Sequence, residues 1–142
     1  MPRVELSPIE VVNNMLNAFS ASDADRVAAY CAANARYLNV ALPPAVVGHH
    51  AIRVGVQTLA SHVTNLSVEV VASVMGGGLV MNRRIEKWLW KSDGLPVTLE
   101  VMGHFVVRNG LIAEWTDFFD EGQAQILKHL QAAAPTAPMG TA

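Results

Sequence analysis

The sequence predicts an α+β domain, in which helices come first and a curved antiparallel sheet follows. Up to residue 62, apolar residues recur mainly at the spacing of helices. From residue 65 to residue 120, four segments alternate as strands do, and turns rich in Gly, Asn and Asp separate them. An order of helices followed by strands is typical of α+β domains whose helices cover one face of the sheet.

The first predicted helix has a clear start signal. Ser7 can cap it, Pro8 suits its first position, and Glu10 stands three residues after the cap, which makes a capping box. Apolar residues then recur at helical spacing, at Ile9, Val12, Leu16 and Phe19. We therefore expect a helix in residues 8–20.

Two further helices and one early strand are predicted in the first half of the chain. A short helix in residues 21–32 would be capped by Ser22 or Asp23, and a third helix covers about 49–62. Between them, residues 35–42 have the pattern of a short strand that ends at two prolines.

The pattern in the second half of the sequence predicts four consecutive strands, in residues 65–75, 79–90, 96–110 and 111–120. The Asn-Gly pair before the last strand is a strong hairpin signal. A short helix in residues 121–133 follows. Because there is no repeat and no domain boundary, residues 1–131 are expected to form one domain and residues 132–142 a mobile tail.

Composition narrows the classes of function. Of 142 residues, 51% are hydrophobic and 15% charged, so the chain has much apolar surface to bury or to place around a cavity. A net charge of −2 without a basic run argues against nucleic acid as a partner. No apolar run reaches a membrane span of about 18 residues, and the first residues lack the apolar core of a signal peptide. Cys31 is the only cysteine, which excludes an internal disulfide and favours a reducing cytoplasm.

Charged and aromatic residues share one face of the predicted strand in residues 79–90. Because alternate residues of a strand point the same way, this face carries Asn82, Arg84, Glu86, Trp88 and Trp90. Taken alone, Arg84 with Glu86 would more often be an exposed cross-strand charge pair. The tryptophans, taken singly, are more often core or dimer contacts.

The last strand adds a second carboxylate. One of its faces is expected to carry Leu111, Ala113, Trp115, Asp117 and Phe119, and the other Ile112, Glu114, Thr116 and Phe118. The strand between has an apolar face from Val97 to Val107. If all three faces lie on the concave side of the sheet, one arginine and two carboxylates enter an apolar pocket together. Burying such charges is costly unless they pair with one another.

Tyr37 and Asn39 share one face of the early strand, where a phenol and an amide could hold a ligand or a water. With these residues, three motifs occur in order: Tyr37-x-Asn39, Arg84-x-Glu86, and Trp115-x-Asp117 followed by Phe-Phe-Asp. They resemble the limonene-1,2-epoxide hydrolase family, which has Tyr-x-Asn, Arg-x-Asp and Trp-Arg-Asp-Tyr-Phe-Asp at similar intervals. The resemblance extends from the first helix to about residue 120. It implies a cone-shaped α+β domain with an interior pocket, as in ketosteroid isomerase, usually paired as a homodimer.

The resemblance implies a role for each matched residue. Asp117 would be the general base for the attacking water, which Tyr37 and Asn39 hold. Glu86 would be the acid that protonates the epoxide oxygen, and Arg84 would bridge the two carboxylates. Two carboxyl groups that share an arginine in an apolar site cannot easily both ionise, so one can act as acid and the other as base. This chemistry requires neither a cofactor nor a metal.

The family has aspartate where this chain has Glu86. The extra methylene moves the carboxyl group by about an ångström, a shift that can cost roughly a hundredfold in rate. The residues expected to form the substrate pocket are Met15, Leu59, Val80, Trp88, Leu99, Val101, Trp115 and Phe119. The five histidines lack the spacing of metal ligands, so no metal site is predicted.

Three functions fit these features. The first is cofactor-free hydrolysis of a small or medium apolar epoxide to a vicinal diol, with water as the second reactant. The second is an isomerase or epoxide-opening cyclase, in which an internal hydroxyl replaces the water. The third is a non-catalytic module that binds a hydrophobic ligand. The Tyr37 and Asn39 pair favours the first, because it suits the binding of water.

Overall fold

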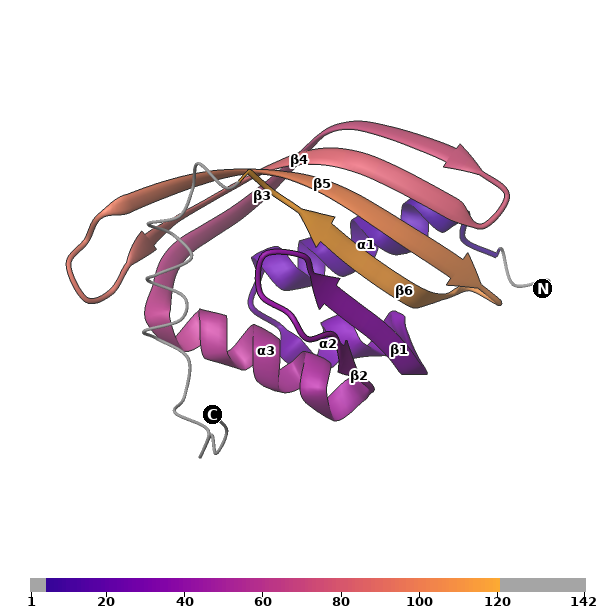
Figure 1. Cartoon of the computed structure of the whole chain (residues 1–142), viewed down its shortest axis with the longest axis horizontal. Helices are drawn as coiled ribbons and strands as arrows, with labels where there is room; N and C mark the ends of the chain where they lie inside the picture. Colours follow the sequence, from indigo (N-terminus) through magenta and orange to yellow (C-terminus); the bar gives the residue numbers. More distant parts are fainter. Residues whose placement is uncertain (1–4, 121–142) are drawn as a thin grey trace.

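The computed structural model describes residues 5–120, which form three helices and six strands (Figure 1). The helix expected in residues 121–133, the tail expected in 132–142 and the domain limit expected at residue 131 lie outside the described residues. Within residues 5–120, no helix has both the length and the apolar character that crossing a membrane requires.

The three helices begin close to the predicted positions; they are α1 Pro8–Ser20, α2 Ala24–Ala29 and α3 His49–His62. The capping box of α1 is present. Ser7 Oγ accepts a hydrogen bond from the N–H of Glu10 (3.2 Å), and the Glu10 carboxylate accepts one from the N–H of Ser7 (3.3 Å). Asp23, one of the two candidates, caps α2 by accepting from the N–H of Arg26 (3.1 Å).

The six strands of this region form one mixed sheet; they are β1 Cys31–Asn39, β2 Val46–Val47, β3 Val63–Gly76, β4 Leu79–Trp90, β5 Pro96–Arg108 and β6 Leu111–Phe118. The order across the sheet is β2-β1-β6-β5-β4-β3. β1 runs parallel to β6, and the other neighbouring pairs are antiparallel. The curved sheet arches over the helices (Figure 1), so the predicted α+β fold with helices on one face is confirmed.

β1 begins earlier than predicted, and β2 was not predicted at all. Residues 31–34 read Cys-Ala-Ala-Asn, which has no strand alternation, and the pairing of β1 with β6 is irregular between Cys31 and Arg36. β2 is only two residues long and lies after the prolines. Neither segment has a periodic pattern that could have indicated a strand.

The predicted faces of β6 are wrong at its start because the strand contains a bulge. Val106 is opposite Glu114, but Val107 is opposite Ile112, so Ala113 is an extra residue. A bulge reverses the alternation of the residues before it. Ile112 is therefore fully buried, whereas Leu111 is 37% exposed. After the bulge, the alternation places Trp115 and Asp117 on the concave face as predicted.

Two groups of buried residues hold the helices against the concave face. The first joins α1 to the sheet and includes Val12, Met15, Leu16, Val80, Phe105 and Ile112. The second consists of the strand residues Val63, Trp88, Trp90, Val97, Leu99 and Val101, against which Leu59 of α3 packs. Along β4, Arg84 and Glu86 lie between Val80 of the first group and Trp88 of the second. The charged residues thus occupy the gap between two apolar groups.

Candidate active site

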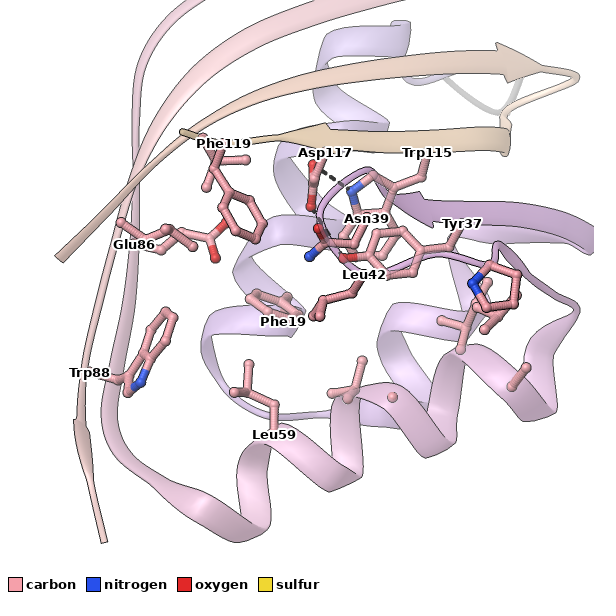
Figure 2. Close-up of a pocket in the computed structure, with 18 residues that line it drawn as sticks. Phe19, Tyr37, Asn39, Leu42, Leu59, Glu86, Trp88, Trp115, Asp117 and Phe119 are labelled. Atoms are coloured by element: carbon pink, nitrogen blue, oxygen red, sulfur yellow. Dashed lines mark hydrogen bonds between the residues drawn. The ribbon is translucent and has the colours of Figure 1, made fainter. Parts of the chain in front are cut away.

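A cavity of about 240 Å³ lies between the concave face of the sheet and α3 (Figure 2). Of the residues that the structure describes, four polar ones reach its wall, namely Tyr37, Asn39, Glu86 and Asp117. The remaining wall is aliphatic or aromatic and consists of Phe19, Leu42, Pro44, Val46, Ala51, Ile52, Gly55, Val56, Leu59, Trp88, Leu99, Val101, Trp115 and Phe119. Figure 2 shows Glu86 and Trp88 on one side, Tyr37 and Trp115 on the other, and Leu59 on α3 below.

Six of the eight predicted pocket residues line this cavity; they are Leu59, Trp88, Leu99, Val101, Trp115 and Phe119. Met15 and Val80 do not, which corrects the prediction. Both are at most 1% exposed in the apolar group that α1 forms with the sheet. Met15 belongs to α1, and α1 packs directly over the start of β4, where Val80 lies. Neither side chain therefore borders empty space.

Arg84 joins the two carboxylates. Its Nη2 donates to Oδ1 of Asp117 (2.8 Å) and to Oε2 of Glu86 (3.0 Å), and its Nε donates to the same oxygen of Glu86 (3.1 Å). The third nitrogen, Nη1, donates to Oδ1 of Asn82 (2.9 Å). Arg84 is 0% exposed, whereas both carboxylates reach the cavity wall. The cation therefore lies behind the carboxylates and away from a ligand.

These contacts exclude the interpretation of Arg84 and Glu86 as an exposed charge pair. Glu86 is only 7% exposed and Asp117 only 5%. An exposed cross-strand pair does exist on the opposite face of the sheet, between Arg83 and Glu100 (2.6 Å). Because successive side chains of a strand point to opposite faces, Arg83 and Arg84 of β4 place the two pairs on opposite sides of the sheet.

Burial and charge act in opposite directions on the pKa values of the cluster. Burial lowers the pKa of Arg84, but the adjacent carboxylates of Asp117 and Glu86 more than offset this, so the guanidinium stays protonated. Burial raises the pKa of Glu86, and Arg84 lowers it only in part. Glu86 is therefore suited to hold a proton that an exposed glutamate would release.

From the described residues, Asp117 accepts more hydrogen bonds than Glu86 does. Oδ1 accepts from Arg84 and from the indole Nε1 of Trp115 (3.0 Å), and Oδ2 accepts from the phenol of Tyr37 (3.4 Å). Several donors around one carboxylate suit its ionised form. The two carboxyl groups are thus set in different surroundings, as an acid and a base require.

Tyr37 and Asn39 reach the cavity because β1 lies beside β6. In the register of these strands, Tyr37 is next to Trp115 and Asn39 next to Asp117. Burial, followed by the charges of Asp117 and Glu86, raises the pKa of Tyr37, so the phenol remains a hydrogen-bond donor. Asn39 Oδ1 accepts from the N–H of Ala41 (3.1 Å), which fixes the orientation of the amide. The structure brings all five predicted catalytic residues together.

Sequence reasoning missed several contributors to the site. Strand alternation predicts the correct face for Asn82 but no role for it. Its position two residues before Arg84 is the signal that points to the hydrogen bond between them. The sequence pattern likewise predicts Trp115 only as part of the cavity wall and not as a hydrogen-bond donor to Asp117. Leu42, Pro44 and Val46 come from a segment around two prolines, where no periodicity indicates which side chains point inward.

Among residues 5–120, no group of three or more His, Cys, Asp or Glu side chains is arranged so that it could hold a metal ion. Apart from two tryptophans, the polar side chains that line the cavity in the described part of the chain are two carboxylates, one phenol and one amide. These groups can hold a water, accept a proton from it and donate another.

The curved sheet, the covering helices and the cavity between them define a cone-shaped domain of the ketosteroid isomerase-like class. More specifically, residues 12–115 match the sequence pattern of the SnoaL-like domain, and the chain belongs to this family.

Solved structures agree with this class. A protein from Catenulispora acidiphila with a ketosteroid isomerase-like fold has a TM-score of 0.74 at 16% identity, over 78% of this chain and 85% of that one. A protein from Jannaschia sp. CCS1, assigned as a SnoaL-like polyketide cyclase, has a TM-score of 0.75 at 16% identity, over 95% and 99%. An LEH-like epoxide hydrolase from M. tuberculosis has a TM-score of 0.71 at 25% identity, over 89% and 90%. The first two similarities show the fold alone.

Proposed function

We propose that this protein hydrolyses an apolar epoxide to a vicinal diol without a cofactor. One observation carries the proposal: two buried carboxylates share one buried arginine at the wall of an apolar cavity. The similarity to the LEH-like epoxide hydrolase supports the same activity, as does the resemblance of three motifs to the limonene-1,2-epoxide hydrolase family, with Glu86 in place of its aspartate. An apolar wall suits a neutral substrate, since the only buried cation among residues 5–120 is already paired with both carboxylates.

The proposed reaction is a single acid–base step. A water lies between Asp117, Tyr37 and Asn39, and Asp117 takes one of its protons as the water oxygen attacks a ring carbon of the epoxide. The C–O bond of the ring breaks, and its electron pair goes to the epoxide oxygen, which takes a proton from Glu86. After the diol leaves, a proton passes from Asp117 back to Glu86. No covalent intermediate with the enzyme forms.

The proposed roles follow from the surroundings of the two carboxyl groups. Asp117 accepts hydrogen bonds from three side chains and acts as the base. Glu86, whose pKa burial raises, starts protonated and acts as the acid. The tryptophan next to it on the same face of β4, Trp88, limits how much water enters the cavity. Scarcity of other water favours attack by the one that Asp117 holds.

An epoxide-opening cyclase or isomerase is the second candidate. The assignment to the SnoaL-like family favours it. The same acid and base would serve, but a hydroxyl of the substrate would replace the water. The product would then be a cyclic ether or an isomer, with no atom from solvent.

Labelled water separates these possibilities. The protein is incubated with a panel of apolar epoxides and hydroxy-epoxides in ¹⁸O-water, and the products are identified by mass spectrometry. Hydrolysis yields a diol with one ¹⁸O, whereas cyclisation yields an unlabelled product. The proposal fails if no epoxide is opened, which is also the result expected of a non-catalytic binding module.

Asp117→Asn tests the proposed base, and Glu100→Gln is a matched control on the opposite face of the sheet. General acid–base groups contribute about 10²–10⁴-fold to rate. Asp117→Asn should therefore lose at least about a hundredfold in diol formation, while Glu100→Gln keeps the activity of the unaltered protein. Full activity of Asp117→Asn would rule out the proposed mechanism.

We also propose a homodimer that covers the outer face of the sheet. Met102 and Phe118 are cross-strand neighbours on that face, and they are 47% and 48% exposed. Contiguous exposed apolar side chains of this kind mark protein contacts. Sedimentation should give the mass of two chains, and Phe118→Glu should shift it toward one; a monomeric unaltered protein would refute the proposal.

A further inference from the structure

Arg84 and Asp117 are in contact although their strands are not neighbours. β5 runs between β4 and β6, and its Gly103 is opposite Asn82 on one side and opposite Asp117 on the other. Adjacent strands are about 4.8 Å apart. The guanidinium of Arg84 must therefore lie across β5 to bring its Nη2 within 2.8 Å of Asp117. It crosses the strand at Gly103.

There is no room for a side chain at this crossing. A Cβ atom at position 103 would collide with Nη1 of Arg84, and it would lie 2.7 Å from Oδ1 of Asn82 and 2.6 Å from Cε2 of Phe105. The neighbours have little freedom to move away. Arg84 and Phe105 are both 0% exposed, and hydrogen bonds from three sides hold the guanidinium.

The backbone does not require glycine at this position. Gly77, Gly94 and Gly110 have positive φ angles in turns, but Gly103 lies in the middle of β5 and is not among the glycines with positive φ. Glycine inside a strand is unfavourable, because it loses more conformational freedom on folding than other residues. The space that its missing side chain leaves is therefore the reason for this glycine.

We propose that Gly103 is a positioning residue of the site: it provides the gap through which Arg84 reaches Asp117 and joins it to Glu86. The residue touches no substrate and acts only through the guanidinium. The ring of Phe105 borders this gap. The Cζ of Arg84 lies over the ring, 5.8 Å from its centroid, which is within the range of a cation–π contact.

The proposal has a kinetic consequence, which rests on the proposed hydrolysis. Alanine at position 103 would push the guanidinium away from its place between the carboxylates. Arg84 lowers the pKa of Glu86, so its displacement should raise that pKa further. The limb of the pH–rate profile that reports the loss of the acid's proton should then move to higher pH.

Gly103→Ala is compared with two control variants. At Gly76, at the end of β3, an added Cβ would have no atom within 4 Å. At Gly78, it would collide with the main-chain oxygen of Val107, far from the guanidinium in the register of the sheet. We expect kcat of Gly103→Ala to fall about a hundredfold with little change in KM. Gly76→Ala and Gly78→Ala should keep the kcat and the pH profile of the unaltered protein.

A double-mutant cycle tests the proposal without reference to activity. Gly103→Ala is made alone and together with Arg84→Ala, and the urea midpoint of unfolding is measured for each protein. If Gly103 acts through Arg84, alanine at 103 should lower the midpoint more in the presence of Arg84 than in its absence. If Gly103→Ala alone does not fold, it is placed in a background that also carries Arg84→Ala, Glu86→Gln and Asp117→Asn, which leaves no buried charge unpaired, and this protein should fold.

Each outcome decides the matter. Equal shifts of the midpoint in both backgrounds would overturn the proposal. If Gly103→Ala alone does not fold, failure to fold in the uncharged background as well would also overturn it. A Gly103→Ala protein with unchanged kcat and pH profile, in an enzyme shown to open epoxides, would also overturn it. If no epoxide is opened, the hydrolase proposal fails, while the unfolding cycle still tests Gly103.

Discussion

The indole N–H of Trp115 donates a hydrogen bond to Oδ1 of Asp117, two residues further along β6 (3.0 Å). The same oxygen accepts from Arg84, so it is occupied on two sides. Oδ2 accepts only the longer hydrogen bond from Tyr37 among the described residues (3.4 Å). It is therefore the oxygen of Asp117 that can take a proton from water. Trp115 thus acts on the charge of the site as well as on its shape.

Removing the indole N–H should reduce catalysis more than binding. Trp115→Phe keeps an aromatic wall but leaves Oδ1 with one donor fewer. A hydrogen bond to a charged group contributes about 1.5–3 kcal/mol, so we expect kcat for epoxide hydrolysis to fall about ten- to hundredfold, with little change in KM. Trp90→Phe is the control, because Trp90 is buried but does not line the cavity. Equal effects of the two substitutions would contradict this role of Trp115.

The pKa of Glu86 predicts how stability depends on pH. Burial raises this pKa above that of an unfolded glutamate, about 4.3. Between the two values, the folded state keeps a proton that the unfolded state has lost, so the free energy of unfolding should fall as pH rises. Glu86→Gln cannot ionise and should lack this contribution.

Urea unfolding of both proteins from about pH 4 to about pH 9 measures the effect. As pH rises, the free energy of unfolding of Glu86→Gln should increase relative to that of the unaltered protein, because the other groups titrate alike in both. A difference that does not depend on pH would show that folding does not raise the pKa of Glu86.

Shortening Glu86 tests whether its extra methylene matters. Oε2 of Glu86 accepts two hydrogen bonds from Arg84, at 3.0 and 3.1 Å. Glu86→Asp introduces the residue that the similar epoxide hydrolase family has at this position but withdraws the carboxyl group by about an ångström, and a shift of this size can cost roughly a hundredfold in rate. We expect kcat of Glu86→Asp to fall by up to this factor, while Arg84 stays paired with Asp117. An increase in kcat would show that the pocket has not adjusted to glutamate.

Strand alternation predicts the charged part of the site because β4 is regular around Arg84 and Glu86. Arg84 is opposite Val101 and Glu86 opposite Leu99 in an unbroken register with β5, so residues two apart stay on one face. The same reasoning failed at Ile112, since the bulge at Ala113 reversed the alternation. Nothing in the sequence of this segment indicates the extra residue of the bulge. A prediction from alternation must therefore fail on one side of it.

Sequence patterns could predict burial at the concave face but not the location of empty space. Met15 and Val80 face inward as expected, yet α1 packs there and leaves no cavity. Leu42 and Pro44 line the cavity from a segment without periodicity. The position of a cavity depends on how helices lie on the sheet, which is set by contacts between residues far apart in the chain.

A glycine on α3 offers a test of the cavity as a substrate site. Gly55 lies in the middle of the helix and lines the cavity, and a Cβ atom there would have no atom within 4 Å. Glycine within a helix costs about 1 kcal/mol relative to alanine. Since neither a close contact nor a positive φ explains it, we interpret Gly55 as space for the part of the substrate that is remote from the carboxylates.

Gly55→Leu should therefore raise the melting temperature while it excludes larger substrates. Along a series of 1,2-epoxyalkanes of increasing length, each methylene that loses its place in an apolar pocket costs about 0.8 kcal/mol. We expect kcat/KM of Gly55→Leu to fall roughly fourfold per added methylene relative to the unaltered protein, and kcat for the shortest epoxide to stay nearly constant. Gln57→Leu, on the exposed side of α3, should leave the preference for length unchanged. An unchanged preference in Gly55→Leu would mean that the substrate does not reach α3.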